Sequence, residues 1–372
     1  MIATPMYHRT PFRQLRQIYS SLLALGRLPG IAEEINRTIA SNGVEQMAAI
    51  RSLATSPPAT ETVKPPVAAP VLASHKHRLS AFRSELLAKI EQPLLCVDIG
   101  ARWGVDSALL ALKGKAKLLC FDPDEEECAR LQANHSVDEL EYVPLALSSD
   151  GRELSLTITR EPACSSIYDP DEKLYTNYPA LAESAPDRVV CVPSSSLDNF
   201  LAARNLGKPH LFKIDTQGSE LDILKGSVRN LSEVCMIDVE VEFNPLYKGQ
   251  PLFGQVDSFM RTNGFVLWRL THLVHYPVES FDAASTEIEA VAHPPSRIQR
   301  INPGNGQLFW GQAHYVRSSF LVADPTPIDA AFARRAAVVT SAYGYWDLSL
   351  TILEKCPETK VEASDLRAIL RA

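Results

Sequence analysis

The chain has 372 residues, 45% of them hydrophobic, and a formal net charge of −7. This composition supplies enough apolar side chains for one sizeable core and a small appended one, so we expect a globular protein. The acidic balance excludes a protein that grips a phosphate backbone over a wide basic face, and nucleic acid is therefore not expected as a partner.

The seven cysteines and the hydropathy pattern indicate the compartment. The cysteines include no C-x-x-C pair, and several lie inside apolar runs such as LLCVDIG and KLLCFD, which is typical of buried thiols in a reducing environment. No apolar run reaches the roughly 18 to 20 residues of a membrane span, and the N-terminus lacks a signal-peptide pattern. We therefore predict a cytoplasmic protein without a transmembrane segment.

Residues 1–53 are predicted to form an amphipathic helical extension. Apolar residues from Phe12 to Leu25 recur at helical spacing, and a second helix is predicted after a Pro-Gly break. Residues 54–74 contain five prolines and almost no charge, which predicts a semi-extended linker. We interpret the extension as a docking or oligomerisation element, and its clustered arginines leave contact with a membrane surface as the alternative.

Between residues 75 and 322 the pattern changes to alternating helices and strands. Predicted helices run over 79–90, 105–112, 125–134 and 253–262, with two more opened by Ser196 and Glu220. Predicted strands run over 94–99, 117–122, 141–147, 189–192, 210–215, 234–241, 265–270 and 312–316, with an inserted strand over 153–159. This alternation with short connections predicts a doubly wound, mostly parallel α/β sheet. Residues 323–372 are predicted to be a C-terminal tail of two closing helices.

The first candidate site follows the strand 94–99, in the motif CVDIGARWG. Ligands of such sheets bind beyond the carboxyl ends of the strands, where Asp98 is expected to lie. Gly100 allows a tight turn close to a ligand, and Gly104 allows the next helix to start against it. A carboxylate before the first glycine repels a pyrophosphate and attracts a cation, so the motif disfavours a nicotinamide dinucleotide. An ordinary turn between a strand and a helix is the alternative.

Two further strand ends suit a nucleoside. Asp122 ends the second strand, in LLCFDPDEE, where an ionised carboxylate can accept hydrogen bonds from both hydroxyls of a ribose. The same acid also suits a helix N-cap, and Asp122 and Asp124 can divide the two roles. Ala146 and Leu147, at the tip of the third strand, can border an adenine ring.

The stretch KIDTQGSELDILKG carries the third candidate site. Asp215 ends an apolar strand and is expected to face the cleft, with an internal salt bridge to Lys213 as the alternative. Gly218 leaves room for the backbone beside a ligand. Ser219 is predicted to be the N-cap of the following helix, with Asp222 as its capping-box partner.

These motifs resemble the S-adenosylmethionine-dependent methyltransferases of the Rossmann-like class and, within that class, the FkbM family. The resemblance covers about residues 94–317 and is most specific in KIDTQGSELDILKG; VDIGARWG, FDPDEE, LALSSDG, SSIYDPD, SSSLDNFL and VEVEFNPLYKGQPL also match. Two residues depart from the family pattern, because Arg102 replaces a frequent Asn and Asp122 a usual Glu. The resemblance implies a seven-stranded sheet and S-adenosylmethionine as the cofactor.

The resemblance also implies where the cofactor binds. Asp98 and Gly100 border its methionine part, Asp122 the ribose, and the pair Ala146 and Leu147 the adenine. The sulfonium and ammonium groups of this cofactor suit the acid in VDIG, which agrees with the charge argument above. The implied cofactor-binding residues are Asp98, Gly100, Arg102, Gly104, Asp122, Ala146 and Leu147.

Methyl transfer to a hydroxyl requires alignment of the reacting groups, exclusion of water and usually a base. The candidate catalytic acids are Asp215, Glu240 and Glu242, of which the last two share one face of a strand. The candidate acceptor-binding residues are Ser165, Ser166 and Tyr168 of SSIYDPD, together with Gln217 and Glu220. An exposed connecting loop is the alternative for SSIYDPD. No ligand-spaced carboxylate accompanies His272, His275 and His314, so we predict packing histidines and no metal site.

The predicted function is O-methylation of a hydroxyl on a sugar, a glycan or a polyhydroxylated metabolite, an acceptor class that the resemblance alone implies. An N- or carboxyl-methyltransferase with the same cofactor is the first alternative. A non-catalytic scaffold with a methyltransferase fold is the second. The scaffold is disfavoured because a pocket without a ligand gains nothing from clustered carboxylates that repel one another.

Overall fold

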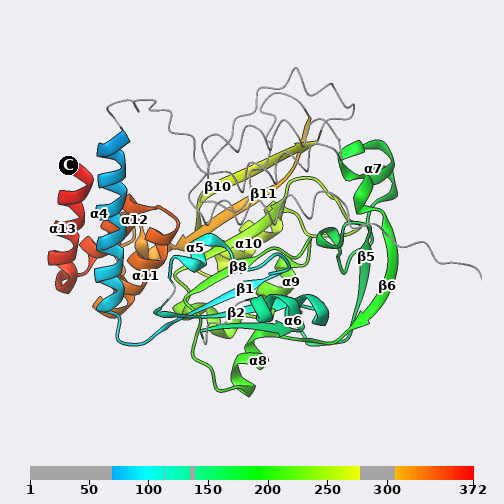
Figure 1. Cartoon of the computed structure of the whole chain (residues 1–372), viewed down its shortest axis with the longest axis horizontal. Helices are drawn as coiled ribbons and strands as arrows, with labels where there is room; N and C mark the ends of the chain where they lie inside the picture. The colour runs from blue at the N-terminus through cyan, green and yellow to red at the C-terminus, as the bar shows by residue number, and fades with distance from the viewer. Residues whose placement is uncertain (1–68, 113, 135–138, 277–305) are drawn as a thin grey trace, which may run out of the picture. The chain divides into compact units, whose positions relative to one another are not determined.

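The computed structural model describes residues 69–112, 114–134, 139–276 and 306–372 (Figure 1). The predicted helical extension, residues 1–53, lies outside the described residues, as do residues 54–68 of the predicted linker, so the docking role stays a prediction. The last linker residues instead open helix α4, Ala69–Ala88. In the described part of the chain no helix is long and apolar enough to cross a membrane.

A seven-stranded sheet forms the centre of the described fold, with the order β10-β11-β9-β8-β1-β2-β3. Its strands are β1 Leu94–Ile99, β2 Ala116–Asp122, β3 Leu140–Pro144, β8 Leu211–Ile214, β9 Met236–Glu242, β10 Phe265–Tyr276 and β11 Gln307–Arg317. The neighbours from β3 to β9 pair in parallel, whereas β11 is antiparallel to both β9 and β10. The predicted doubly wound, mostly parallel, seven-stranded sheet is therefore confirmed.

Helices cover both faces of this sheet. The helices of the described residues are α4, α5 Ser107–Leu110, α6 Glu125–Asn134, α7 Glu172–Asn177, α8 Leu197–Ala203, α9 Glu220–Lys225, α10 Phe253–Thr262, α11 Ala330–Ala342, α12 Trp346–Lys355 and α13 Lys360–Arg371, of which α7 belongs to the insertion between β4 and β7 and does not cover the sheet. The bounds predicted for α6 and α10 are confirmed. The prediction of a helix over 105–112 was too long: the Asp106 carboxylate accepts from the N–H of Ala108 and starts the helix late, and the chain turns again before Gly114, whose φ is 90°.

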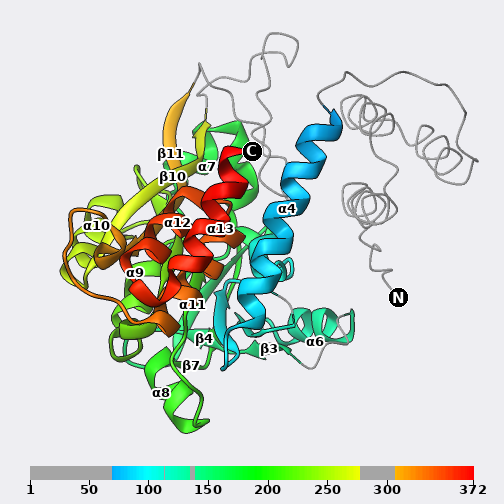
Figure 2. The same ribbon diagram turned by 90° about the vertical axis from the view of Figure 1, so that its left-hand side faces the viewer.

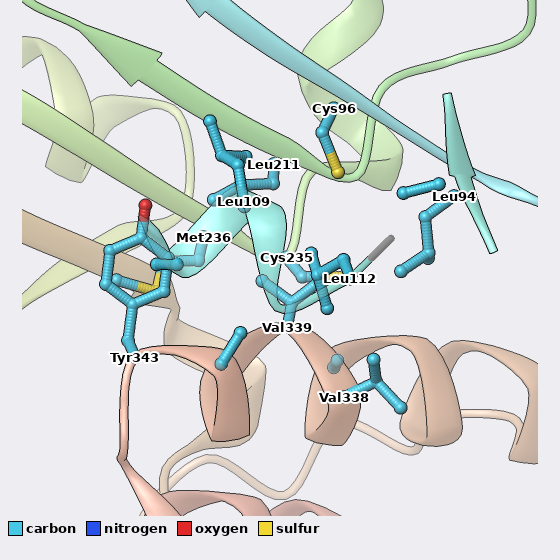
Figure 3. Packing of buried hydrophobic residues seen from close by; sticks show 14 of the residues in the cluster. Leu94, Cys96, Leu109, Leu112, Leu211, Cys235, Met236, Val338, Val339 and Tyr343 are labelled. Carbon is cyan, nitrogen blue, oxygen red and sulfur yellow. The ribbon is translucent and has the colours of Figure 1, made fainter. Parts of the chain in front are cut away.

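The first face of the sheet packs against helices from both ends of the described chain. Leu94, Cys96 and Leu211 lie in one apolar cluster with residues of α4, α5 and α11 to α13. Figure 3 shows Val338 and Val339 of α11 close to these strand residues, and Figures 1 and 2 both place α4 beside the C-terminal helices. The opposite face, with its own apolar cluster, packs against α8, α9 and α10.

The C-terminal tail has three helices where two were predicted. Gly344, at a φ of 78°, turns the chain between α11 and α12, and a short 3-10 turn over Pro357–Thr359 separates α12 from α13. The tail also shares the main core, since Ala333, Ala336 and Val339 of α11 are fully buried against the sheet.

An insertion of residues 148–195 lies beyond the strand ends. Its strands β5, Leu154–Thr159, and β6, Pro186–Val192, form a separate antiparallel pair at the side of the sheet opposite α11 to α13 (Figure 1). The prediction that strand 189–192 resumes the parallel sheet was therefore wrong. Val189 is 63% exposed, which a strand covered on both faces does not allow. The predicted strand 141–147 is also divided, into β3 and β4, Ala146–Leu147, and β4 pairs with β7, Ser194–Ser195.

Candidate active site

The candidate site lies at the carboxyl ends of the parallel strands. From β1 the chain adds β2 and β3 on one side, and it then returns to add β8 and β9 on the other side. The strand order therefore reverses between β1 and β8, which is where ligands bind in open α/β sheets. Asp98 of β1 is in register with Lys213 of β8, and Lys213 with Asp238 of β9.

Gly100 brings the ends of β1 and β8 together. Its φ is +85°, and a Cβ at this position would lie 1.9 Å from the carbonyl oxygen of Asp215. The N–H groups of Gly100 and Ala101 both donate to the carbonyl of Phe121, at 2.9 and 3.1 Å. Only glycine fits this close approach, so the backbones of the two motifs, VDIG and KID, pack directly against each other. Gly104 also has a positive φ, of +98°.

Asp98 is a buried acid with one unsatisfied oxygen. It is 2% exposed, and its Oδ2 accepts a long hydrogen bond from the N–H of Asp106 at 3.4 Å. Its Oδ1 has no hydrogen-bond partner among the described residues, and the Nζ of Lys213 lies 3.8 Å away. Burial raises the pKa of Asp98 to about 6, although the charge of Lys213 opposes the shift.

Asp122 and Asp124 divide the strand-tip and capping roles. Asp124 accepts from the N–H of Glu127 at 3.1 Å and so caps α6, while Asp122 accepts from the N–H of Asp124 at 2.8 Å. Arg102 bonds Asp124 at 2.8 Å and lies 3.8 Å from Asp122. Burial raises the pKa of Asp122 to about 6. The arginine that departs from the family pattern thus lies against the expected ribose site.

Ala146 and Leu147 form β4, next to Ser194 and Ser195 of the insertion. Leu147 is buried and Ala146 is half-buried. Ser148 follows directly, and its carbonyl oxygen would lie 2.3 Å from a Cβ on Gly226 at the end of α9. The segment predicted to border the adenine, Ala146 and Leu147, is therefore followed directly by a residue that packs closely against the end of α9.

Near Asp215 lies a buried group of three acids, here called the acid cluster, which consists of Glu220, Glu240 and Glu242. They are 2%, 3% and 2% exposed, and one carboxylate oxygen from each lies within 4.8 Å of the others. Burial and mutual repulsion raise the pKa values of Glu240 and Glu242 well above their usual range. The prediction that these two acids share one face is confirmed, because both side chains project from β9 into the cluster.

Gln217 connects Asp215 with the acid cluster. Its Nε2 donates to Oε2 of Glu240 at 2.7 Å and lies 3.4 Å from Oδ1 of Asp215, and its Oε1 lies 3.0 Å from the Tyr247 hydroxyl. The φ of Gln217 is 60°, a left-handed conformation that glycine usually occupies. Asp215 also lies 3.5 Å from the Nζ of Lys213, so the internal salt bridge is formed as well.

Glu220 shapes the loop before α9. Its Oε1 accepts from the N–H groups of Thr216 and Gly218, at 2.7 and 3.2 Å. The capping box predicted for Ser219 and Asp222 was wrong. Ser219 precedes α9 without capping it, because its hydroxyl donates to Oγ1 of Thr216, and Asp222 instead accepts from the N–H of Ser149.

The SSIYDPD loop covers Gln217. The Ser166 hydroxyl donates to the Gln217 carbonyl at 2.7 Å and accepts from the N–H of Tyr168 at 3.0 Å. The Tyr168 ring would lie 3.5 Å from a Cβ on Gly218. Ser165 instead faces β5, where its hydroxyl accepts from the N–H of Thr159. Ser166 and Tyr168 thus lie by the acid cluster, and Ser165 lies behind them.

Two residues of the loop after β9 were missed as site residues. Tyr247 is 2% exposed, and its hydroxyl lies 2.7 Å from the Cys164 carbonyl as well as close to Gln217. Gln250 is 6% exposed, and its side chain lies near Glu242, where it opposes part of the rise in the pKa of that acid. Both belong to the motif NPLYKGQPL, which contributed to the family resemblance but in which the sequence pattern indicated no functional residue.

The histidines take part in packing and pairing. His314 is buried, with Nε2 3.3 Å from Oδ1 of Asp238 and Nδ1 against the Tyr345 hydroxyl. His272 and His275 are half-buried in β10. Among the described residues, the group whose geometry could hold a metal ion is the acid cluster, and it contains no histidine.

The sheet order, with β11 running against the other strands, and the acids and glycines at the strand tips define a Rossmann-like methyltransferase. Residues 98–267 match the methyltransferase FkbM domain, so this part of the chain is similar to the FkbM family. The resemblance seen in the motifs is thereby confirmed.

Curated relatives align with about half of this chain. It is 27% identical over 206 residues to the 2-O-methyltransferase NoeI of Sinorhizobium fredii, across 51% of this chain and 85% of the relative. It is 23% identical over 193 residues to the hexuronic acid methyltransferase AglP of Haloferax volcanii, across 50% and 74%. A solved magnesium protoporphyrin IX methyltransferase from Synechocystis aligns at 11% identity over 78% of this chain and 98% of that one, with a TM-score of 0.29, too low to support an inference.

S-adenosylmethionine is the cofactor of this family, and the residues at the ends of β1 and β2 fit it. Oδ1 of Asp98, which accepts no hydrogen bond among the described residues, suits a cationic group. Gly100 keeps any side chain away from this strand end and lets its backbone pack against the Asp215 carbonyl. Asp122 offers a buried carboxylate at the end of β2, as a ribose requires.

Proposed function

We propose that this protein transfers the methyl group of S-adenosylmethionine to a hydroxyl of a sugar, a glycan or a polyhydroxylated metabolite. The observation that carries the proposal is the acid cluster beside Asp215, because several buried carboxylates supply hydrogen-bond acceptors and a base for hydroxyl groups. The names of the two curated relatives, a 2-O-methyltransferase and a hexuronic acid methyltransferase, support the same acceptor class.

The cofactor-binding role is proposed for the strand tips nearest β1. Asp98 and Gly100 hold the methionine part, with Gly104 opening the turn beyond them, and Asp122 holds the ribose. Arg102 orients Asp122 through the contacts that it makes with both acids of this turn. Ala146 and Leu147 border the adenine. When bound, the cofactor supplies an electrophilic methyl group on a sulfonium.

The base is proposed to be Glu240. A hydroxyl must lose its proton as its oxygen takes the methyl group, and a positioned carboxylate accelerates such a step by about 10² to 10⁴. Burial and the neighbouring carboxylates raise the pKa of Glu240, which makes its ionised form a stronger proton acceptor than an exposed glutamate. Gln217 orients Glu240, and Asp215 lies on the side facing Gly100.

The experiment is transfer of a labelled methyl group from S-adenosylmethionine to a panel of methyl glycosides, inositols, amines and carboxylic acids. We expect label in an ether of a glycoside or an inositol, located by mass spectrometry and NMR. Label only in amines or carboxylates would overturn the proposal in favour of the N- or carboxyl-methyltransferase. Failure to bind S-adenosylmethionine in calorimetry would favour the scaffold.

A further inference from the structure

Two buried polar atoms next to the acid cluster lack hydrogen-bond partners among the described residues. They are Oε1 of Glu242 and Nε2 of Gln250, on side chains that are 2% and 6% exposed. The first is an acceptor and the second a donor, and a buried atom of either kind is costly to leave unpaired. The two side chains are neighbours, and the Gln250 amide partly offsets the rise in the pKa of Glu242, but no hydrogen bond of normal geometry joins Oε1 and Nε2. One ligand group can therefore pair with both atoms.

The amide of Gln250 is locked in one orientation. Its Oε1 accepts from the backbone N–H groups of Leu246 and Tyr247, at 2.7 and 2.5 Å. Turning the amide over would break both bonds, so Nε2 remains the atom that faces Glu242 and Gly218. A Cβ on Gly218 would lie 3.4 Å from this Nε2, and the glycine therefore leaves the space beside the donor open.

This fixed donor selects the chemistry of the ligand. Three glutamates alone are also a plausible ligand set for a divalent cation. However, a locked N–H group that faces the same space repels a cation, and the amide oxygen that would bind one is already occupied. A hydroxyl donates one hydrogen bond and accepts another, so it satisfies Glu242 and Gln250 together.

We propose that Glu242 and Gln250 form a subsite for a second hydroxyl of the acceptor, adjacent to the one that is methylated, so that the acceptor is a vicinal diol. This inference rests on the proposed function. Glu240 and Glu242 lie two residues apart on one face of β9, and their carboxylates converge within 4.8 Å. Glu240, which Gln217 joins to Asp215, binds the hydroxyl that is methylated. Glu242, which lies further along β9 and further from β8, binds the adjacent hydroxyl.

The surroundings of Glu242 offer room for the rest of a sugar. Glu242 borders a pocket of about 430 Å³, and the other lining residues are Phe243, Leu252, Phe253, Gly254 and Gln255. This volume lies in the range of about 300 to 1,000 Å³ typical of small-molecule sites, and an apolar lining with few polar groups is also typical. A pyranose ring presents both kinds of surface, through its C–H faces and its hydroxyl edge.

The test variant is Gln250→Glu, which keeps an oxygen for the N–H groups of Leu246 and Tyr247 and removes the donor. Gln132→Glu is the matched control, because Gln132 also bonds backbone on both sides of its amide, at Leu140 and Tyr142, but lies on α6 and is exposed. Both variants are assayed in the full chain with methyl glycosides and with their monodeoxy counterparts that lack one neighbouring hydroxyl.

We expect Gln250→Glu to raise KM for the methylated glycoside about 10- to 100-fold, with unchanged affinity for S-adenosylmethionine and with Gln132→Glu behaving like the unmodified chain. With the unmodified chain, KM for the monodeoxy counterpart should exceed KM for the glycoside by a similar factor. With Gln250→Glu, removal of the neighbouring hydroxyl should raise KM little further. Equal activity on the glycoside and its monodeoxy counterpart would overturn the subsite while leaving the proposed function intact. Methylation of amines alone would instead remove the proposed function.

A calorimetric titration with Mg²⁺ or Mn²⁺ alone provides the second arm. We expect no heat that depends on Glu242, because the locked donor disfavours a cation. Saturable binding of either ion by the unmodified chain that disappears in Glu242→Gln would overturn the diol subsite and assign the acid cluster to a metal.

Discussion

Gln217 donates its side-chain amide to Glu240 at 2.7 Å while the same nitrogen lies 3.4 Å from Asp215. One residue thus holds two carboxylates that would otherwise repel each other, and it does so from a left-handed backbone conformation, at a φ of 60°. Strained backbone of this kind persists where the surroundings impose it and is frequent at functional sites. The Tyr247 hydroxyl and the Ser166 hydroxyl, which bond the amide and the carbonyl of Gln217, supply those surroundings.

Replacing Gln217 by Leu should therefore affect catalysis more than cofactor binding. Without the amide, Glu240 and Asp215 lose their shared donor, and the base is no longer held in one orientation. We expect kcat to fall about 10- to 100-fold with little change in the Kd for S-adenosylmethionine. Initial rates and calorimetry measure the two quantities, and an unchanged kcat would remove Gln217 from the catalytic machinery.

Asp98→Asn should weaken cofactor binding. The substitution keeps the size of the side chain but removes the charge that faces Lys213 and that we propose to face the cationic groups of the cofactor. We expect the Kd for S-adenosylmethionine to rise about 10- to 100-fold. Calorimetry measures the affinity, and thermal melting followed by circular dichroism verifies the fold. An unchanged Kd in a folded variant would show that Asp98 serves the sheet alone.

Asp215→Asn separates the acceptor side of the site from the cofactor side. Asn can still contact Lys213 and Gln217, but the carboxylate next to Glu240 is lost. We expect cofactor affinity to stay within several-fold and kcat to fall about tenfold or more. If turnover equals that of the unmodified chain, the Asp215 carboxylate has only the salt-bridge role that its contact with Lys213 provides.

Much of the fold was predictable because its signals are local. Helix α6 begins at an Asp-Pro-Asp-Glu cap and α10 follows a helical repeat, and both bounds matched the predictions. The acids at the ends of β1, β8 and β9 converge because parallel strands in one sheet end at one edge. Parallel pairing is expected once the helices between the strands are recognised, because each helix carries a right-handed crossover.

The missed features depend on contacts between distant residues. An apolar run such as that of β6 suits a buried parallel strand equally well, and only its pairing with β5 leaves Val189 exposed. Gln250 is a polar residue in a Pro- and Gly-containing loop. Its role arises from Glu242 and from the backbone that fixes its amide, so no spacing rule identifies it.

The acid cluster should make stability depend on pH. Burial raises the pKa of Glu220 from 4.5 to about 7, although the N–H groups of Thr216 and Gly218 oppose the shift. The folded state therefore binds a proton more tightly than the unfolded state, so the stabilisation that the proton provides is present below pH 4.5 and is lost as pH rises to about 7.

Glu220→Gln tests this dependence, because Gln can accept the same loop hydrogen bonds without ionising. We expect the variant to gain stability relative to the unmodified chain between pH 4.5 and about 7, by up to about 3 kcal/mol. Urea unfolding at several pH values measures the difference. A difference that does not change with pH would mean that Glu220 ionises as freely in the folded state as in the unfolded chain.

Gly100→Ala should damage both stability and cofactor binding, and Gly114 provides a matched control. Both glycines have a positive φ, of +85° and +90°, so both substitutions force alanine into a left-handed conformation that costs about 1 to 2 kcal/mol. A Cβ at Gly114 meets nothing within 4 Å, whereas at Gly100 it would lie 1.9 Å from the Asp215 carbonyl and push β1 and β8 apart. We therefore expect Gly100→Ala to lower the free energy of unfolding by about 2 to 5 kcal/mol and to abolish S-adenosylmethionine binding, while Gly114→Ala binds normally. Equal losses of stability in the two variants would show that backbone strain, and not the contact between the two motifs, accounts for the glycine in VDIG.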